Sequence, residues 1–217
     1  MTGLSLEEYF EKEFFKPYEM TSTSFDVTSK PTIKAERADM SARAQINDVS
    51  MIVPSPTRII AEKVEVNMGG GGLWSCARDY TQILQRLLQD PCPFFQNQET
   101  LEYAFQPCLS PSSKQHMHDI LSGKGGNMFT GGSLPAEIEV DYTMAGLCTP
   151  KGLEGKRGGA GDAISWGGLP NLLWCVDRKK KKAVFYGSQL LPPGDLMSGQ
   201  AFARFEEAVF SGDSAKL

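Results

Sequence analysis

The chain has 217 residues, of which 22 are Lys or Arg and 26 are Asp or Glu, so its formal net charge at pH 7 is −4. Hydrophobic residues make up 41% and aromatic residues 10% of the sequence, which is ordinary for a chain that buries a core. The mild acidity argues against a nucleic-acid-binding protein, and the even spread of Trp, Phe, Leu and Ile excludes collagen-like, low-complexity and disordered chains.

The N-terminal segment has neither the basic start nor the uninterrupted apolar stretch of a secretory signal. No window approaches the roughly 18 consecutive apolar residues of a membrane span. The cysteines are odd in number and lack CxxC spacing, which is typical of reduced thiols in a cytosolic protein; they are Cys76, Cys92, Cys108, Cys148 and Cys175. We therefore expect a cytoplasmic protein without membrane contact, whose cysteines serve as small buried residues.

The first half of the chain shows helical patterns. Apolar residues between 4 and 16 recur at helical spacing and predict a first helix that Pro17 ends. Residues 18–66 are mixed, and no structure is assigned to them. A tight glycine loop follows, and behind it Ser75 is a candidate N-cap for a helix that continues to Leu88. A further short helix is predicted over residues 112–121.

From about residue 137 the pattern changes to strands. Alternating residues over 138–144 predict a half-buried strand, and further strands are predicted over 163–167, 171–177 and 182–189. A closing helix is predicted over 201–210.

This order of elements predicts an α+β fold. The first region, residues 1–130, is mostly helical and carries the Gly-rich loop. The second region, residues 131–217, is an antiparallel β-sheet with a C-terminal helix.

Several patterns that are associated with cofactors or catalysis are incomplete. The glycines at 69–72 and the Gly123-Lys124 pair complete neither a Walker loop nor a dinucleotide fingerprint, so they are read as tight turns and no cofactor is expected. His116 and His118 point to different sides of the predicted helix, so they are read as surface residues and no metal is expected. The basic run 178–182 lies between two predicted strands and is read as a solvated hairpin tip.

Three stretches form a series in a fixed order. The first runs from Leu6 to Phe25 and contains Phe15-Lys-Pro-Tyr-Glu-Met-Thr-Ser-Thr-Ser-Phe25; the second is Gly70-Gly-Gly-Leu-Trp-Ser-Cys-Ala-Arg-Asp-Tyr80; the third is Ser165-Trp-Gly-Gly-Leu-Pro-Asn-Leu-Leu-Trp-Cys-Val-Asp177, followed by Tyr186-Gly-Ser-Gln-Leu-Leu-Pro-Pro-Gly-Asp195. Together they resemble the serine β-lactamase and penicillin-binding-protein superfamily, in its class C-like branch of esterases and transesterases. They are similar to fungal lovastatin-type transesterases, which work in secondary metabolism, over nearly the whole chain.

The resemblance implies acyl transfer through a serine ester, with an acyl ester or thioester as the small-molecule partner. It implies a partial β-lactamase/transpeptidase-like fold and assigns Trp166, Gly167, Gly168 and Leu169 to substrate binding. The backbone N–H of Leu169 would be one of the two oxyanion donors. Trp166 replaces the lysine that would hold a β-lactam carboxylate, which favours esters or thioesters over penicillins.

Two catalytic elements of that family are missing from the sequence. No lysine has serine three positions before it, and no tyrosine is followed two positions later by asparagine. The chain therefore resembles only the C-terminal part of the family, and the catalytic set is incomplete. Three interpretations stay open: a truncated form of an ordinary serine hydrolase or acyltransferase, a non-catalytic protein that binds an acyl ligand or partner, and one half of a split enzyme.

The missing part also predicts association. In the family, N-terminal strands and the C-terminal helix cover the same sheet. Without those strands we expect an exposed edge in the sheet over residues 137–191. The chain would then be unstable alone, or it would pair with a copy of itself or with a chain that supplies the N-terminal half.

Overall fold

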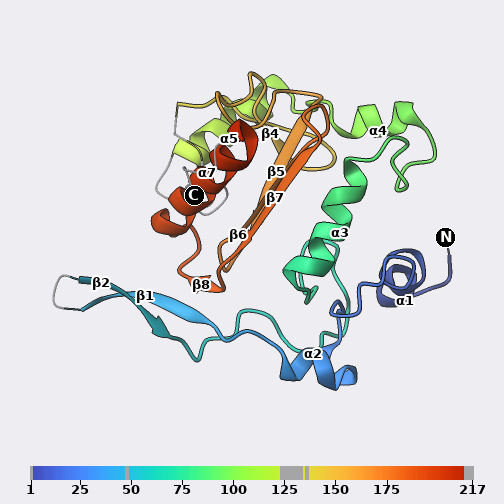
Figure 1. The fold of residues 1–217 in the computed structure, drawn as a ribbon, viewed down its shortest axis with the longest axis vertical. Coiled ribbons are helices and arrows are strands. Elements are labelled where there is room, and N and C mark those ends of the chain that lie inside the picture. The colour runs from blue at the N-terminus through green and yellow to red at the C-terminus, as the bar shows by residue number, and fades with distance from the viewer. Residues whose placement is uncertain (1, 47–48, 123–133, 135–136, 213–217) are drawn as a thin grey trace.

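The computed structural model describes residues 2–46, 49–122, 134 and 137–212. Its centre is a five-stranded antiparallel sheet with the order β3-β4-β5-β6-β7. The strands are β3 (Asp141–Tyr142), β4 (Leu147–Cys148), β5 (Ala163–Gly168), β6 (Leu172–Asp177) and β7 (Lys182–Gly187). The C-terminal helix α7 (Leu196–Ser211) lies on one face and α3 (Ala77–Leu87) on the other (Figure 1). The predicted α+β fold with a C-terminal helix is confirmed.

Alternation along the strands divides the core into two clusters, because successive side chains point to opposite faces of a sheet. Leu173 and Cys175 of β6 pack with Phe202 of α7 on one face. Ile164 of β5 packs with Leu84 of α3 on the other face. The sheet is therefore buried on both sides, which explains why its strands are rich in apolar residues.

The remaining helices lie mostly in the first half of the chain. α1 (Leu6–Phe10) begins with a capping box between Ser5 and Glu8 and continues into a π-helical turn over Glu11–Phe15, which confirms the first predicted helix. A 3₁₀ turn (Val27–Ser29), α2 (Pro31–Ala35), α4 (Gln98–Ala104) and α5 (Pro111–Ser122) follow. α5 confirms the helix predicted over 112–121, and both of its histidines are exposed as predicted. No described helix is long and apolar enough to cross a lipid bilayer.

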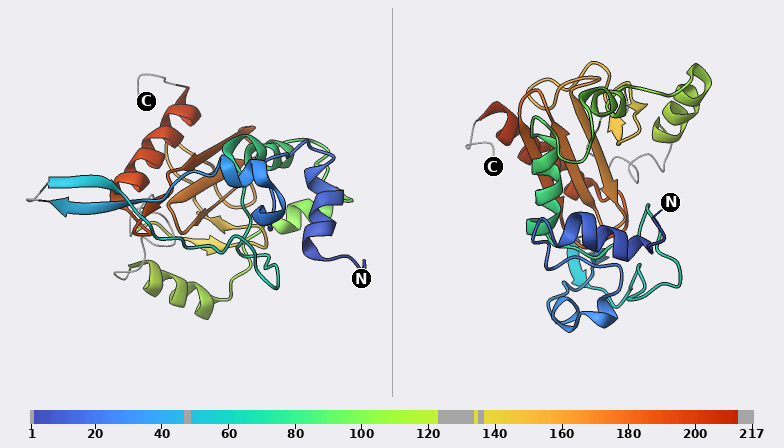
Figure 2. Two further views of the ribbon diagram at one scale, coloured as in Figure 1. Left: turned by 90° about the horizontal axis from the view of Figure 1, so that it is seen from below. Right: turned by 90° about the vertical axis from the view of Figure 1, so that its right-hand side faces the viewer.

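The region without an assigned structure contains a β-hairpin. β1 (Ser41–Ile46) pairs antiparallel with β2 (Val49–Pro54), and β1 also pairs in parallel with β8 (Leu190–Leu191) in a second sheet of order β2-β1-β8. The hairpin extends away from the body of the protein (Figures 1 and 2). The alternation of apolar and polar residues was a poor guide to structure in two places, this hairpin and the strand predicted over 138–144.

Three local expectations need correction. The predicted strand over 138–144 shrinks to β3, because Thr143 Oγ1 accepts hydrogen bonds from the N–H groups of Ala145 and Gly146 and closes a tight turn. Ser75 is not the N-cap of α3, because its hydroxyl pairs with Thr23 Oγ1 at 2.8 Å and the cap moves to Cys76. The closing helix begins at Leu196 instead of 201, because the Asp195 side chain accepts from Ser198 N.

The basic run does form the β6–β7 hairpin tip, and its side chains also bind helix ends. Lys182 Nζ donates to the carbonyl oxygens of Val209 (2.8 Å) and Phe210 (3.2 Å) in the last turn of α7. Lys181 Nζ donates to Leu88 O at the end of α3 (2.9 Å). These cations satisfy terminal carbonyls and oppose the negative end of each helix dipole. The run therefore joins both helices to the sheet.

Candidate active site

The open edge of β5 holds the residues that the sequence predicts for substrate binding. Trp166, Gly167 and Gly168 form the second half of this strand, and Leu169 begins the turn to β6. β4 pairs with β5 only at Ser165, so on the side away from β6 none of the described strands pairs with the residues that follow Ser165. Leu169 is 49% exposed, and its N–H makes no hydrogen bond to another described residue. This N–H is therefore not committed to another described residue.

The two glycines of β5 have different structural explanations. A Cβ on Gly167 would lie 2.9 Å from the carbonyl oxygen of Leu172, so packing against β6 already requires glycine there. A Cβ on Gly168 would come no closer than 3.4 Å to the Leu172 side chain, which is ordinary contact. Packing therefore explains Gly167 and leaves Gly168 available for the predicted close approach of a substrate.

Trp166 belongs to an aromatic corner. Its ring meets that of Tyr142 edge to face, with 5.2 Å between the ring centroids and 86° between the planes. Trp174 is its neighbour across the β5–β6 pair. Burial raises the pKa of the Tyr142 hydroxyl. Such a surface suits an apolar acyl chain better than a carboxylate.

An ion pair between a buried aspartate and an exposed lysine holds Tyr142 beside this edge. The Asp141 carboxylate is fully buried, accepts from the N–H of Tyr142 (2.7 Å) and Leu109 (3.2 Å), and pairs with Lys114 Nζ of α5 at 2.5 Å. The hydrogen bond with Asp141 raises the pKa of Lys114, so the ammonium group of Lys114 stays charged at neutral pH. Because β3 and α5 are joined here, the position of the Tyr142 backbone is fixed.

Asn171 anchors the turn that carries Leu169. Asn171 is 1% exposed and has φ of 56°, a left-handed conformation that asparagine tolerates. Its Nδ2 donates to the carbonyl oxygens of Leu190 (2.7 Å) and Pro192 (2.9 Å). Its Oδ1 accepts from the N–H groups of Gly194 (2.9 Å) and Asp195 (3.0 Å). The turn is thus tied to the loop that precedes α7.

The first two stretches of the sequence series meet behind the sheet. Asp79 of α3 is fully buried, and its Oδ2 accepts from Ser22 N (2.7 Å) and Thr23 Oγ1 (2.9 Å). Ser24 and Trp74 form an isolated antiparallel bridge next to these bonds. α3 then packs on β7, where Tyr80 contacts Phe185 with ring centroids 5.1 Å apart. The hydrogen bonds to Asp79 therefore fix α3 to the N-terminal segment, and α3 in turn packs on the sheet.

Cys148, which lies on β4 next to the site, is not an activated nucleophile. Cys148 lies on β4 and is buried, and burial raises the pKa of its thiol to about 11, with the Asp141 carboxylate adding to the effect. A thiol with such a pKa is protonated at neutral pH and reacts poorly. Cys92 and Cys175 are also buried, as the sequence predicts, whereas Cys108 is exposed.

The structure brings all the sequence-predicted site residues together, since they are consecutive at one end of β5. The sequence analysis missed Tyr142, Asp141 and Asn171. The Pro170-Asn171 pair between two predicted strands was a turn signal that pointed to a special backbone conformation. Nothing in the sequence pattern linked Tyr142 to Trp166.

Comparison with known proteins agrees with this arrangement. A Beta-lactamase family model matches residues 1–208. The Aspergillus terreus monacolin J acid methylbutanoyltransferase is 26% identical over 210 residues, which are 97% of this chain and 50% of that protein. A lovastatin esterase of Penicillium rubens is 27% identical over 206 residues, 91% of this chain and 49% of that protein.

A solved structure shows the same fold. Unliganded simvastatin synthase (LovD) from Aspergillus terreus superposes with a TM-score of 0.84 at 24% identity, covering 98% of this chain and 52% of that one. The chain thus spans about half the length of the relatives that it matches.

Proposed function

Because this chain belongs to the β-lactamase family, we propose that it contributes the oxyanion strand and the acyl-binding wall of a serine acyl-transfer site. The observation that carries this proposal is the edge of β5 beyond its pairing with β4, where the N–H of Leu169, which bonds to no other described residue, follows Trp166-Gly167-Gly168. A backbone N–H fixed in this way stabilises the negative oxygen of a tetrahedral intermediate.

The proposed reaction has two steps, and the same oxyanion donor serves both. A serine oxygen attacks the acyl carbon, the C–O or C–S bond of the ester or thioester breaks, and the leaving group takes up a proton. The hydroxyl of an acceptor, or water, then attacks the serine ester, and the serine regains its proton. The Leu169 N–H would serve the oxyanion of both steps.

The substrate class follows from the aromatic corner. Trp166 stands where a lysine would bind a β-lactam carboxylate, and it packs with Tyr142 and Trp174. We propose a short branched acyl group carried as an ester or thioester. Two relatives support this class, one named for methylbutanoyl transfer to monacolin J acid and one for lovastatin esterase activity. By the same analogy the acceptor is a hydroxy acid and the setting is fungal secondary metabolism, in the cytoplasm.

Neither a Ser-x-x-Lys motif for the nucleophile nor a Tyr-x-Asn motif for the proton carrier occurs in the 217 residues. In this proposal they come from the part of the relatives that the chain does not match, in the same polypeptide or in a second one. β7 supports the second possibility, because it ends the order of the sheet and none of the described strands pairs with its outer side. Such an edge can accept a strand of another chain, including a second copy.

The absent nucleophile also favours a second candidate function. The chain would then bind an acyl ligand or a partner protein without turnover. The mass of the endogenous protein and the identity of its N-terminal peptide separate the two, since a longer product with an upstream Ser-x-x-Lys would identify an ordinary serine enzyme.

Complementation tests the oxyanion role directly. The chain is co-expressed with the N-terminal half of the Aspergillus terreus transferase, and turnover of a 2-methylbutanoyl thioester is measured beside labelling by a fluorophosphonate serine probe. We expect label on the added half and turnover only in the mixture. Leu169→Pro removes the N–H and should lower turnover by about 100-fold, whereas Leu169→Ala keeps the N–H and should stay within about threefold. Equal turnover in the two variants would exclude Leu169 as the donor, and a probe-labelled lone chain would exclude the need for a second half.

A further inference from the structure

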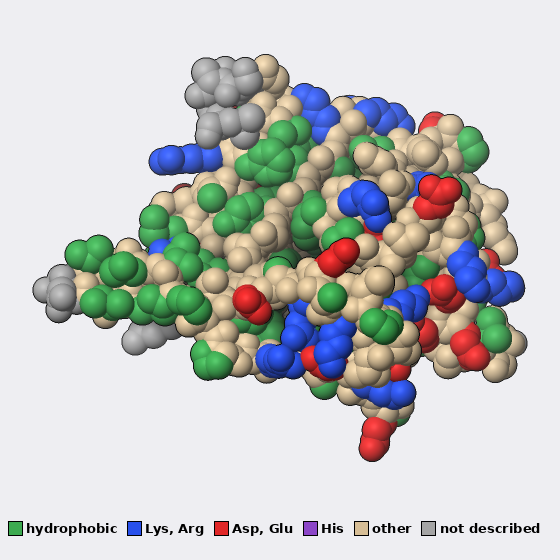
Figure 3. All heavy atoms as spheres, turned by 60° about the horizontal axis from the view of Figure 1, so that its bottom comes forward, with side chains coloured by type: hydrophobic (Ala, Val, Ile, Leu, Met, Phe, Trp, Pro, Cys, Tyr) green, Lys and Arg blue, Asp and Glu red, His purple; other side chains and the backbone are tan. Residues whose placement is uncertain are grey.

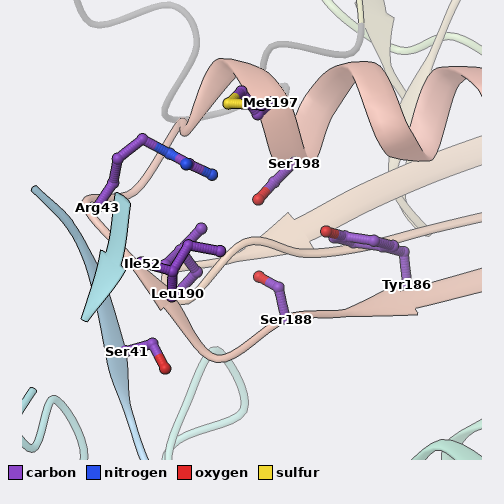
Figure 4. A pocket seen from close by; sticks show the side chains of 8 residues that line it. All are labelled: Ser41, Arg43, Ile52, Tyr186, Ser188, Leu190, Met197 and Ser198. Atoms are coloured by element: carbon purple, nitrogen blue, oxygen red, sulfur yellow. The ribbon is translucent and has the colours of Figure 1, made fainter. Parts of the chain in front are cut away.

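A small cavity of about 150 Å³ lies between the hairpin and the first turn of α7. Its walls come from β1, β2, β7, β8 and α7, so elements from both ends of the sequence build it. In Figure 4 the guanidinium of Arg43 and the hydroxyls of Tyr186, Ser188 and Ser198 turn toward the same space. Four polar groups that converge on one cavity are typical of a ligand site.

Arg43 has a donor left over in this cavity. Its Nε and Nη2 both bind the carboxylate of Asp195, whose side chain is only 3% exposed. Its Nη1 has Ser50 Oγ as its neighbour at 3.4 Å, which is long for a hydrogen bond. One edge of the guanidinium is thus saturated, while the other can donate to a bound acceptor group.

The local charge favours an anion over a neutral group. Burial alone would raise the pKa of Asp195, but hydrogen bonds from Arg43 and Ser198 outweigh burial and keep this pKa below its ordinary value. The negative charge of the carboxylate therefore balances the positive charge of Arg43. The same carboxylate is also the N-cap of the 16-residue helix α7, so one negative charge faces both the arginine and the positive end of the helix. A helix N-terminus carries about half a positive charge, which leaves the cavity slightly positive.

The mouth of the cavity is apolar. Ile52 of β2 is 59% exposed and Met197 of α7 is 56% exposed, and both belong to its lining together with the buried Leu190. Large aliphatic side chains exposed at a polar cavity are suited to contact with an alkyl segment. The lining therefore fits a small carboxylate with a short carbon chain.

The cavity lies at the same end of the sheet as the open edge of β5. Gly168 pairs with Leu172, and Leu172 pairs with Gly187, the residue before Ser188 of the cavity. Two strand spacings, about 10 Å, therefore separate Gly168 of β5 from Gly187 of β7. Ser188 Oγ also donates to Pro170 O (3.0 Å) in the turn that carries Leu169. The cavity therefore adjoins the turn that carries Leu169, on the α7 face of the sheet, where Tyr186 lies opposite Leu173.

We propose that this cavity binds the carboxylate of a small hydroxy acid, which under the proposed function is the acyl acceptor. The carboxylate would accept from Arg43 Nη1 and the Tyr186 hydroxyl, and the carbon chain would lie against Ile52 and Met197. The inference rests on the proposed function only for the identity of the ligand as acceptor. The cavity and its donors are independent of any nucleophile.

The test is titration of the full chain, labelled with ¹⁵N, with 3-hydroxybutanoate and with its methyl ester. We expect the acid to shift the amide signals of Ser188 and Ser198 with a dissociation constant on the order of 10 mM, and the ester to bind at least about tenfold more weakly. Equal binding of acid and ester, or no shift at these amides up to about 50 mM acid, overturns the proposal.

Two variants locate the donors. Tyr186→Phe removes one hydroxyl and should weaken binding of the acid by about fivefold. Arg43→Lys keeps a cation beside Asp195 but removes Nη1, and should weaken it by a similar factor. Tyr103→Phe, at a 64% exposed tyrosine of α4, is the matched control and should leave binding unchanged. The comparison of the acid with its methyl ester uses the unmodified chain. The proposal can therefore still be refuted if one of the variants folds poorly.

The readout separates this inference from the proposed function. Amide shifts at Ser188 and Ser198 report the cavity, whereas turnover in the complemented protein and its dependence on Leu169 report the acyl site. Shifts without turnover would leave a carboxylate site in a non-catalytic protein. Turnover without shifts would keep the acyl function and refute the cavity as the acceptor site.

Discussion

The five-stranded sheet and the β1–β2 hairpin use apolar residues in opposite ways. In the sheet, alternate side chains are buried on both faces against α3 and α7. In the hairpin, one face carries only apolar side chains, because Ala42, Ala44 and Ile46 lie opposite Val53, Met51 and Val49, and several of them are exposed. They form a green strip along the projecting arm in Figure 3. Apolar composition alone therefore does not tell which strands form the core.

The sheet and the hairpin also differ in the polar contacts that hold them in place. The sheet layer contains the fully buried pair Arg157–Glu206, with 2.6 Å between Nη1 and Oε1, which joins the loop before β5 to α7. The hairpin is held by a two-residue pairing with β8 and by the Arg43–Asp195 pair. We conclude that the sheet layer defines the stability of the fold and that the hairpin is attached to it.

The largest expected effect comes from breaking the buried pair. Arg157→Met keeps the volume but leaves the Glu206 carboxylate buried without its cation, which should lower the free energy of unfolding by about 3–5 kcal/mol in a urea titration. Adding Glu206→Gln to the same chain removes the uncompensated charge and should restore most of this loss. Arg204→Met, an exposed arginine of the same helix, is the matched control. If single and double variants were equally unstable, charge burial would not be the cause.

Asn171 should follow in size, because it connects the sheet to the loop beside the hairpin. Asn171→Gly accepts the left-handed backbone but loses the four side-chain hydrogen bonds, at a cost of about 2–4 kcal/mol in unfolding free energy. Asn171→Ala loses the same bonds and adds about 1 kcal/mol of backbone strain at φ 56°. An alanine variant as stable as the glycine variant would show that the turn relaxes.

The same two regions show what the sequence could reveal. β5 and β6 were predicted because their alternation is regular and their pairing is local. The site residues Trp166 to Leu169 were assigned through the resemblance, and their role in substrate binding stays a prediction. The partners of Asn171 and Arg43 were out of reach, since Asn171 binds backbone groups 19–24 positions away and Arg43 binds a carboxylate 152 positions away.

Local chemistry explains the errors. The predicted strand over 138–144 has the right alternation, but the Thr143 hydroxyl offers the backbone a turn that competes with the ladder. The hairpin was missed because Ile52 and Val53 are adjacent apolar residues, so β2 lacks a polar face along its length. Periodicity reports burial, and it fails where a side chain bonds its own backbone or where an apolar strand stays exposed.

Acid should affect the N-terminal region through Glu62. Hydrogen bonds from Lys34 and Arg37 lower the pKa of this carboxyl from 4.5 to about 2 in the folded chain. A lowered pKa stabilises the fold above the unfolded value, so this contribution is present above pH 4.5 and is lost as pH falls toward 2. Glu62→Gln should therefore flatten the fall of the thermal midpoint between these values. Glu65→Gln, at an exposed neighbour, should leave the slope unchanged.

The smallest effect is expected on the hairpin and is the sharpest test of the comparison. Val49 is 58% exposed, so Val49→Thr keeps the β-branched shape and removes little buried surface, and the free energy of unfolding should change by less than about 0.5 kcal/mol. Ile164→Val in β5 deletes one methyl group at a position that is 1% exposed and should cost about 1 kcal/mol. Val49→Thr exchanges a methyl for a hydroxyl and Ile164→Val deletes a methyl, and the cost of both changes in a urea titration rises with the burial of the position. A Val49→Thr cost equal to that of Ile164→Val would mean that the apolar strip is buried in solution, because another surface covers it.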